Sequence, residues 1–278
     1  MSIYNKTSYR ISKAVTNSYS TSFSFAISLM NKEHREAIYA LYGFVRLADE
    51  IVDTFHDFDK ENLLTKFETD LNDALKNKIS TNPILNSFQL TVAKYEIPYK
   101  FINSFLESMK ADLTKTEYKI KLETDTYIYG SAEVVGLMCL CIFCDGDKEL
   151  FQKLQKPAMK LGSAFQKVNF LRDLKNDIEV LNRSYFPEIR NGNFTNKEKL
   201  IVVREIELEF TEALTGLKQL PMDAKTAVYV AYLYYNTLLN KLKRTPAKNI
   251  AQNRVRISNT TKMIIMMKAY FQVKAKLI

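Results

Sequence analysis

A narrow polar stripe runs through the otherwise apolar residues 38–53, and it limits the folds that this chain can adopt. The segment contains YGFVRLADEIVD, and its polar stripe follows an i, i+4, i+7, i+11 spacing: Tyr42, Arg46, Asp49 and Asp53. At about 100° per residue, these side chains share one face of a helix. Because the other faces are largely apolar, the helix should lie inside a bundle with its stripe lining a cavity. An edge helix whose acids simply meet solvent is the alternative.

A second stripe of the same kind lies in residues 161–177, which read LGSAFQKVNFLRDLKND. Its members are amides and carboxylates at i, i+3, i+7 and i+11: Gln166, Asn169, Asp173 and Asp177. The lysines of this segment fall off the stripe, whereas a solvent-facing stripe usually mixes both charges. Two helices therefore each present a pair of aspartates four residues apart.

The four aspartates would converge if the two helices faced each other across a cavity. Crowded carboxylates raise one another's pKa unless cations neutralise them. Hard oxygen donors suit Mg²⁺, which commonly bridges to phosphate oxygens. We therefore expect Mg²⁺ ions that hold a diphosphate, with Arg46 and Arg172 contacting the same group. A di-iron bundle would need Glu-x-x-His pairs, and the two acid-bearing segments carry none.

Helical spacing extends along the whole chain and predicts an all-α fold. Only 7 Gly and 6 Pro occur in 278 residues, which disfavours a many-stranded β protein. No Gly/Ser-rich or Pro-rich linker divides the chain, so one domain over residues 1–278 is the economical interpretation. We expect a loop at residues 181–194 and helices near residues 8–17, 21–30, 32–55, 60–76, 83–94, 98–114, 122–144, 147–180, 196–219, 223–245 and 258–276.

Hydroxyl side chains gather in YSTSFSFAISL, just before an apolar run. Ser20 and Ser22 could cap a helix. They could also help a helix N-terminus to bind a phosphate group. The sequence alone does not decide between helix capping and phosphate binding.

The net charge of +9 fits a nucleic acid, an anionic membrane or a small polyanion as partner. The basic residues are scattered and form no zinc-finger or RNP-like motif, so we expect no nucleic-acid partner. The C-terminal stretch TTKMIIMMKAYFQVKAKLI could rest on a membrane interface, or it could form an amphipathic helix packed on the domain.

The N-terminus lacks the apolar core of a signal peptide, and the apolar run VVGLMCLCIFC is too short to span a bilayer. We therefore expect a cytoplasmic protein, with or without peripheral contact with the inner face of the cell membrane. Cys139, Cys141 and Cys144 all lie in that apolar run, so we expect buried inert thiols in a reducing compartment rather than a zinc site.

Together, these segments resemble the squalene and phytoene synthase family, the head-to-head prenyltransferases. RLADEIVD matches the family's first aspartate-rich motif and QKVNFLRDLKND its second. The segments YSTSFSFA, YIYGSAEVVGLM and RSYFP fall in the family's order and spacing. The resemblance covers nearly the whole chain and is strongest to bacterial phytoene synthases. It implies one all-α isoprenoid-synthase bundle around a central cavity, with prenyl diphosphate substrates and two or three Mg²⁺ ions.

The resemblance also implies roles for individual residues. Tyr129 matches a tyrosine near the reacting carbons, and the four aspartates are catalytic through the metal. The metal-binding positions are Asp49, Asp53, Asn169, Asp173 and Asp177. The positions that hold the prenyl diphosphates are Ser20, Ser22, Tyr42, Arg46, Gln166 and Arg172.

The chain departs from the family pattern at two positions. Asn176 replaces a usual Glu, and Thr21 stands where a basic residue is common. The segment NRVRISNTTK matches only weakly, so no role is carried over from it. Glu50 lies about 100° from Asp49 on a helix, so we expect it to pair outside the metal site.

The implied reaction joins two geranylgeranyl diphosphates to phytoene through a cyclopropyl diphosphate, in carotenoid biosynthesis and without NADPH. A squalene or dehydrosqualene synthase joining two farnesyl diphosphates is the close alternative. A catalytically inactive helical assembly factor of the same fold is the non-enzymatic alternative.

Overall fold

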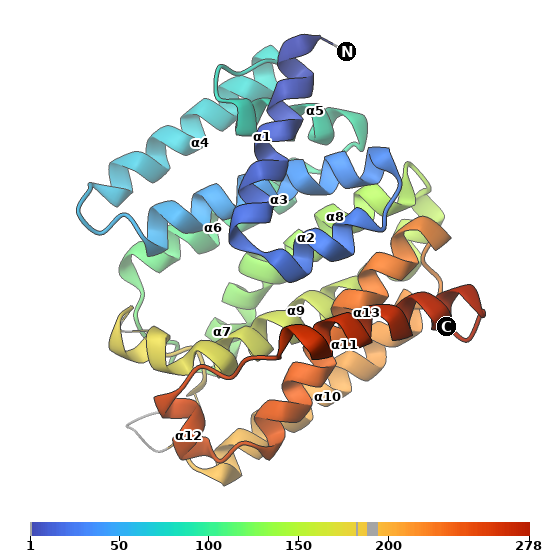
Figure 1. Cartoon of the computed structure of the whole chain (residues 1–278). Helices are drawn as coiled ribbons and strands as arrows, with labels where there is room; N and C mark the ends of the chain where they lie inside the picture. The colour runs from blue at the N-terminus through green and yellow to red at the C-terminus, as the bar shows by residue number, and fades with distance from the viewer. Residues whose placement is uncertain (1, 182, 188–193) are drawn as a thin grey trace.

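The computed structural model describes residues 2–181, 183–187 and 194–278 (Figure 1). The side chains of Thr21 and Ser22 lie outside the described part, as do residue 182 and residues 188–193 of the expected loop. In the described part the regular elements are helices, and the one isolated β-bridge joins Glu117 to Ser184. The predicted all-α fold is therefore confirmed.

The helices, in chain order, are α1 (Ile3–Tyr19), α2 (Thr21–Ser28), α3 (Lys32–Asp53), α4 (Lys60–Asn77), α5 (Pro83–Lys94), α6 (Tyr99–Thr114), α7 (Lys121–Ile128), the π-helical turn η1 (Tyr129–Glu133), α8 (Val134–Cys144), α9 (Lys148–Glu179), α10 (Asn196–Leu217), α11 (Met222–Arg244), α12 (Ala247–Gln252) and α13 (Asn259–Lys274). Figure 1 shows them packed as one bundle, with α13 crossing the outside of α11.

Three features differ from the expected helices. The first helix begins at Ile3 rather than near residue 8, because the Ser2 side chain caps it by accepting from the Asn5 amide. The expected helix over residues 122–144 is interrupted by η1, a kind of turn that often marks a functional site. The short helix α12 had no clear periodic signal, and it fills the turn between α11 and α13.

Aromatic packing fixes the orientation of α3. Phe44 is fully buried, and its ring stacks on Phe88 of α5 with centroids 4.0 Å apart. It also contacts Phe67 of α4 and Phe105 of α6, with centroid distances of 5.7 Å and 5.4 Å. Phe44 lies opposite the polar stripe on an ideal helix, so this packing turns the stripe away from the rings of Phe67, Phe88 and Phe105.

Two glycines let η1 pack closely between α6 and α9. A Cβ at Gly130 would lie 2.0 Å from the Ser108 Oγ, and one at Gly162 would lie 2.7 Å from the Ala132 carbonyl oxygen. Any side chain at these positions would therefore force the helices apart. The turn therefore packs closely on α6 at Gly130 and on α9 at Gly162.

The continuous helical stretch Lys121–Cys144 is long and apolar enough to cross a bilayer. The sequence prediction considered only its apolar second half, and α7 with η1 supplies the added length. Within the apolar window, 67% is buried inside the bundle. Its apolar residues thus build the core of the fold.

Candidate functional site

The two acidic stripes are joined across the bundle by Arg183, which follows α9 in the RSYFP loop. Its Nη1 donates to the Asp53 Oδ1 at 2.8 Å, and its backbone amide donates to the Asp177 carbonyl oxygen at 2.7 Å. Asp53 and Asp177 also lie close enough for each charge to act on the other. The structure therefore places Asp53 of α3 and Asp177 of α9 near each other, with Arg183 contacting both.

The crowded carboxylates hold their protons more tightly than usual. Burial raises the pKa of Asp49 to about 8, with a further contribution from the charge of Asp53 and an opposing one from Arg46. Burial also raises the pKa of Asp177 to about 8, and the charges of Asp173 and Asp53 add to the effect. These shifts are typical of carboxylates that share a site with too few cations.

Asp112 on α6 is a fifth carboxylate, which sequence reasoning missed. Tyr127 donates its hydroxyl to the Asp112 Oδ2 at 2.8 Å, and Arg183 Nη1 lies 3.6 Å from Oδ1. Burial raises the pKa of Asp112 to about 7, Arg183 opposes the shift, and the charge of Asp53 adds to it. No spacing on α6 pointed to this residue, because its partners lie on other elements.

A stack of aromatic rings holds Arg183 in position. Tyr185 lies flat against Phe170 of α9, with centroids 3.9 Å apart and planes 6° apart, and also contacts Tyr127 at 5.2 Å. Thr124 donates its hydroxyl to the Tyr185 carbonyl oxygen at 2.9 Å. Arg183 is therefore buried and pre-positioned between the acids. The RSYFP motif was the signal that could have identified it.

Two arginines contact Asp173 on α9. Arg172 Nε donates to the Asp173 Oδ1 at 3.0 Å, and Arg254 Nε lies 2.7 Å from the same oxygen. Arg254 belongs to the segment between α12 and α13, in NRVRISNTTK, from which the family resemblance carried no role. The C-terminal part of the chain therefore reaches the acidic site.

Arg46 and Glu50 pair with each other on α3. Arg46 Nε donates to the Glu50 Oε2 at 3.0 Å, and the guanidinium lies over the Tyr19 ring at 4.3 Å from its centroid. Glu50 therefore pairs with Arg46, and its expected exclusion from the metal site stays a prediction. Arg46 is held near the acids, because its charge also acts on Asp49.

The amide part of the α9 stripe faces α11. Tyr235 of α11 donates its hydroxyl to the Asn169 Oδ1 at 3.3 Å, and Gln166 lies half-buried on the same stripe.

Tyr42 of α3 packs against Phe23, with ring centroids 5.2 Å apart. Burial raises the pKa of Tyr42 to about 12, Arg46 opposes the shift, and the charges of Asp49 and Tyr235 add to it. Tyr42 thus lies between the two stripes.

Ser20 is the N-cap of α2, since its Oγ accepts from the Phe23 amide at 3.2 Å. The capping interpretation is confirmed for this residue, and its place in phosphate binding stays a prediction. The side chain of Ser22 lies outside the described part of the structure.

Tyr129 lies in η1 and lines a groove of about 430 Å³ between α6 and α7. Ser104 and Glu107 of α6 line the same groove. Among the described contacts, Tyr127 rather than Tyr129 reaches the carboxylates. The structure therefore does not bring Tyr129 to the acids, and its role near the reacting carbons stays a prediction.

The oxygen donors of the site suit Mg²⁺, although they are not gathered at one point. Within residues 2–181, 183–187 and 194–278, no three His, Cys, Asp or Glu side chains lie close enough together to hold a metal ion. Arg183 and Arg254 form ion pairs with Asp53 and Asp173. The pKa values of Asp49 and Asp177 are raised by burial and by the negative charge of neighbouring carboxylates. A set of hard oxygen donors with excess negative charge fits a hard cation.

The three cysteines are unpaired thiols. Burial raises the pKa of Cys139 and of Cys141 to about 12 and that of Cys144 to about 11. At neutral pH these thiols stay protonated, so they are poor nucleophiles and poor metal ligands.

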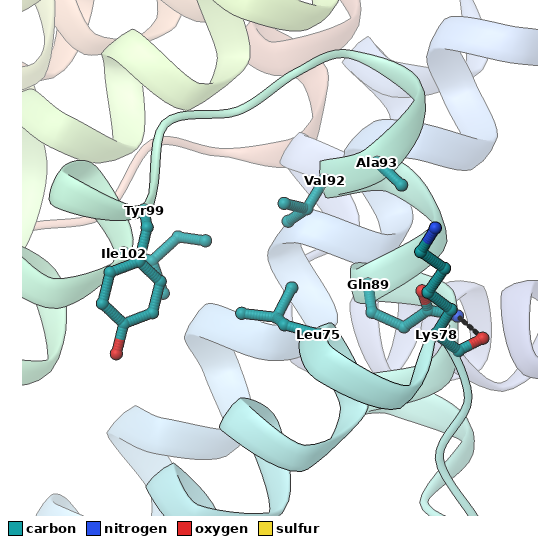
Figure 2. Close-up of a pocket in the computed structure, with 7 residues that line it drawn as sticks. All are labelled: Leu75, Lys78, Gln89, Val92, Ala93, Tyr99 and Ile102. Atoms are coloured by element: carbon teal, nitrogen blue, oxygen red, sulfur yellow. Dashed lines mark hydrogen bonds between the residues drawn. The ribbon is translucent and has the colours of Figure 1, made fainter.

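A smaller pocket of about 270 Å³ lies between α4, α5 and α6 (Figure 2). Its walls include Leu75, Val92 and Ile102, and Gln89 Nε2 donates to the Lys78 carbonyl oxygen at 3.1 Å. No carboxylate lines this pocket, so it is not part of the acidic site.

Comparisons with known proteins point to one family. Residues 16–261 match the model of the squalene/phytoene synthase family. The chain is 26% identical over 270 residues to phytoene synthase 1, chloroplastic, of Solanum lycopersicum, covering 91% of this chain and 65% of that protein. It is also 26% identical over 274 residues to phytoene synthase 1, chloroplastic, of Zea mays, covering 92% and 66%. The chain thus spans just under two thirds of the length of these plant relatives.

Solved structures share the fold. A dehydrosqualene synthase in complex with ligand superposes with a TM-score of 0.84 at 20% identity, covering 98% of both chains. The squalene synthase HpnC from Alicyclobacillus acidocaldarius gives a TM-score of 0.76 at 20% identity, covering 92% of this chain and 98% of that one. With a matching family model over most of its length and the two aspartate stripes in facing positions, this chain belongs to the squalene/phytoene synthase family.

Proposed function

We propose that this protein is a Mg²⁺-dependent prenyltransferase that joins two geranylgeranyl diphosphates head to head to form phytoene. The observation that carries the proposal is the convergence of two aspartate pairs, on α3 and α9, with a raised pKa at Asp49 and at Asp177. A site with excess carboxylate charge suits a cation-bridged polyanion, and a prenyl diphosphate is such a polyanion.

The metal would be held by carboxylate and amide oxygens of the two stripes: Asp49, Asp53, Asn169, Asp173 and Asp177. When bound, Mg²⁺ would supply positive charge that stabilises the departing diphosphate. Asp53 and Asp173 would have to exchange their present contacts with Arg183 and Arg254 for the metal.

The arginines around the site would contact the diphosphate directly. Arg172 and Arg254 lie on one side at Asp173, and Arg46 lies on the other beside Glu50. Charge-assisted hydrogen bonds from guanidinium groups suit phosphate oxygens and would orient the ester for ionisation. Gln166 and Tyr42 would complete the polar contacts, and Ser20 would support them from the N-terminus of α2.

The allylic cation left by diphosphate departure must be kept from water. The aromatic side chains next to the stripes would serve this purpose: Tyr42, Phe165, Phe170 and Tyr235 are all buried or half-buried there. The second prenyl chain then attacks the cation, a proton is lost and a cyclopropyl diphosphate forms. In a second ionisation the cyclopropyl ester releases its diphosphate, the ring rearranges to a linear cation, and loss of a proton from that cation gives phytoene.

The choice of C20 substrates is supported by the sequence relatives, which are phytoene synthases. The fold alone does not distinguish chain lengths, since a dehydrosqualene synthase and a squalene synthase share it. A synthase joining two farnesyl diphosphates is therefore the second candidate. Carotenoid biosynthesis in the cytoplasm is the setting that we propose for the first.

The test is incubation of the purified protein with Mg²⁺ and either geranylgeranyl or farnesyl diphosphate, with and without NADPH. Phytoene formed without NADPH supports the first proposal. Product from farnesyl diphosphate alone replaces it with the second.

An inactive assembly factor of the same fold is disfavoured by the two complete aspartate pairs, which such a protein does not need. Failure to release diphosphate from either substrate, by protein that melts cooperatively, would overturn both enzymatic proposals and favour this one.

A further inference from the structure

The exposed face of α13 carries an apolar stripe. Four large apolar side chains on this helix are more than half exposed: Met263 at 60%, Ile264 at 60%, Met267 at 54% and Phe271 at 62%. Tyr270 adds 40% exposure, and Leu277 just beyond the helix is 69% exposed. Scattered exposed apolar residues are ordinary, but a contiguous stripe of them marks an interaction surface.

The same helix uses a different apolar face to pack on the bundle. Ile265, Ala269 and Val273 are buried at i, i+4 and i+8, and α13 contacts α11 (Figure 1). Ile265 and Met267 are about 200° apart on an ideal helix. One apolar face of α13 is thus buried against the bundle, and the opposite apolar face is exposed to solvent.

The net positive charge of the chain comes from the C-terminal segment that contains this helix. Residues 222–278 contain 11 Lys and Arg and a single acid, Asp223, whereas residues 1–221 contain 29 Lys and Arg and 30 Asp and Glu. The final 20 residues contain no acid and carry Lys262, Lys268, Lys274 and Lys276. The helix that exposes the apolar stripe therefore also carries exposed lysines and no acid, which favours anionic partners.

We propose that α13 docks the protein on the surface of an anionic lipid bilayer, with its exposed apolar stripe in the interface and its lysines against the lipid phosphates. Apolar side chains flanked by lysines on a helix are the features that interfacial helices use. A second copy of this chain fits less well, because a symmetric contact would bring the same lysines together.

The N-terminal end of α13 lies next to the candidate site. Lys262 lies over the Tyr234 ring at 5.8 Å, Tyr234 contacts Tyr235 at 5.4 Å, and Tyr235 donates to Asn169. A docked protein would hold that side of the site near the lipid, where an apolar product could leave. This consequence rests on the proposed function, whereas lipid binding does not.

The test is flotation of the full chain with vesicles of phosphatidylcholine alone or with 30% phosphatidylglycerol. We expect binding to the anionic vesicles, weaker binding to the neutral ones, and a loss with rising salt because exposed charges are screened. The triple variant M263Q/I264Q/F271Q should reduce the bound fraction at least fivefold, and K268E/K274E should do the same.

Matched control variants carry substitutions of the same kinds at exposed positions outside α13. F58Q/I201Q/L208Q replaces three exposed apolar residues outside α13, and K148E/K153E reverses two exposed lysines at the start of α9. Both controls should bind like the unmodified chain. Equal binding by the α13 variants and the controls would overturn the proposal.

Sedimentation equilibrium tests the alternative that a second copy of this chain covers the exposed face of α13. A concentration-dependent dimer that M263Q/I264Q/F271Q abolishes, without vesicle binding by the unmodified chain, would assign this face to a second copy and overturn the lipid proposal. Vesicle binding with no released diphosphate in the activity assay would keep the lipid proposal and overturn the proposed function.

Discussion

Two charged clusters on the same helix, α9, differ in how their charges are balanced. The first surrounds Lys167, which is buried and lies 2.6 Å from the Glu205 Oε1 and 2.8 Å from the Glu209 Oε1. Ser163 also donates to Glu209, at 2.9 Å. The second begins less than two turns further along α9, at Asp173.

The first cluster matches cations to anions, whereas the second does not. Around Lys167, Lys160 and Lys121 also contact the two glutamates, and Glu133 lies near enough to feel their charges. The second cluster has more acids than arginines: Asp49, Glu50, Asp53, Asp112, Asp173 and Asp177 against Arg46, Arg172, Arg183 and Arg254. We infer that a cluster with equal numbers of cations and anions has a structural role, whereas a cluster with excess carboxylates is a candidate cation-binding site.

The largest expected effect is the loss of activity when the unbalanced cluster loses a carboxylate. Asp49→Asn or Asp173→Asn should lower the rate of diphosphate release by on the order of 10³-fold, because the metal that stabilises the leaving group is lost. Circular dichroism should show an unchanged helical fold. Near-normal activity in either variant would refute the metal assignment.

A substitution in the balanced cluster should lower the stability of the fold rather than the activity. Lys167→Met leaves Glu205 and Glu209 without their buried partner, so we expect the free energy of unfolding to fall by about 3 kcal/mol. Urea unfolding measures this change. Activity per folded molecule should stay within a few-fold of the unmodified protein, and a 10³-fold loss would show that the two clusters are not distinct.

The largest contribution to the pH dependence of stability should come from the unbalanced cluster, with a smaller one from Glu133, whose pKa burial raises to about 7. Asp49 and Asp177 keep their protons to a pKa of about 8 in the fold, whereas an unfolded aspartate ionises near 3.9. Between these pH values the folded chain binds more protons than the unfolded chain, so the ligand-free protein should become steadily less stable as the pH rises from about 4 to about 8. Thermal melts across this range measure the loss.

The double variant D49N/D177N is the control for that pH dependence. It removes both titrating groups, so its melting temperature should vary less over the same range and exceed that of the unmodified protein at pH 8.5. An equally steep pH dependence in the double variant would place the titrating groups elsewhere.

The smallest expected effect concerns Arg254, a half-exposed cation that competes with a metal for Asp173. Arg254→Gln should tighten Mg²⁺ binding two- to threefold in the absence of diphosphate, since an exposed ion pair contributes about 0.5 kcal/mol. Isothermal titration calorimetry measures the affinity. Weaker Mg²⁺ binding would mean that Arg254 supports the metal site rather than competing with it.

The periodic parts of the fold and site could be predicted from the sequence. The helices follow from apolar spacing, and the stripes of α3 and α9 follow from the positions of their acids, because residues on one helix face are fixed by a constant rotation. The position of Glu50 about 100° from Asp49, where it pairs with Arg46, follows from the same geometry. These features depend only on neighbours in the chain.

The missed residues depend on contacts between distant segments. Asp112 and Arg254 join the site only after α6 and the α12–α13 connection pack beside it, and nothing in their local sequence marks them. Similarly, the close packing of η1 on both sides at Gly130 and Gly162 depends on α6 and α9. That packing places Tyr127, not Tyr129, at the carboxylates.

The central claim is that the facing aspartate pairs bind Mg²⁺ together with a diphosphate. Calorimetric titration of inorganic diphosphate into the protein, with and without Mg²⁺, tests it most directly. We expect saturable binding only with Mg²⁺, its loss in Asp49→Asn and Asp173→Asn, and its retention in Glu209→Gln of the balanced cluster. Equal binding without Mg²⁺, or by both aspartate variants, would contradict the claim.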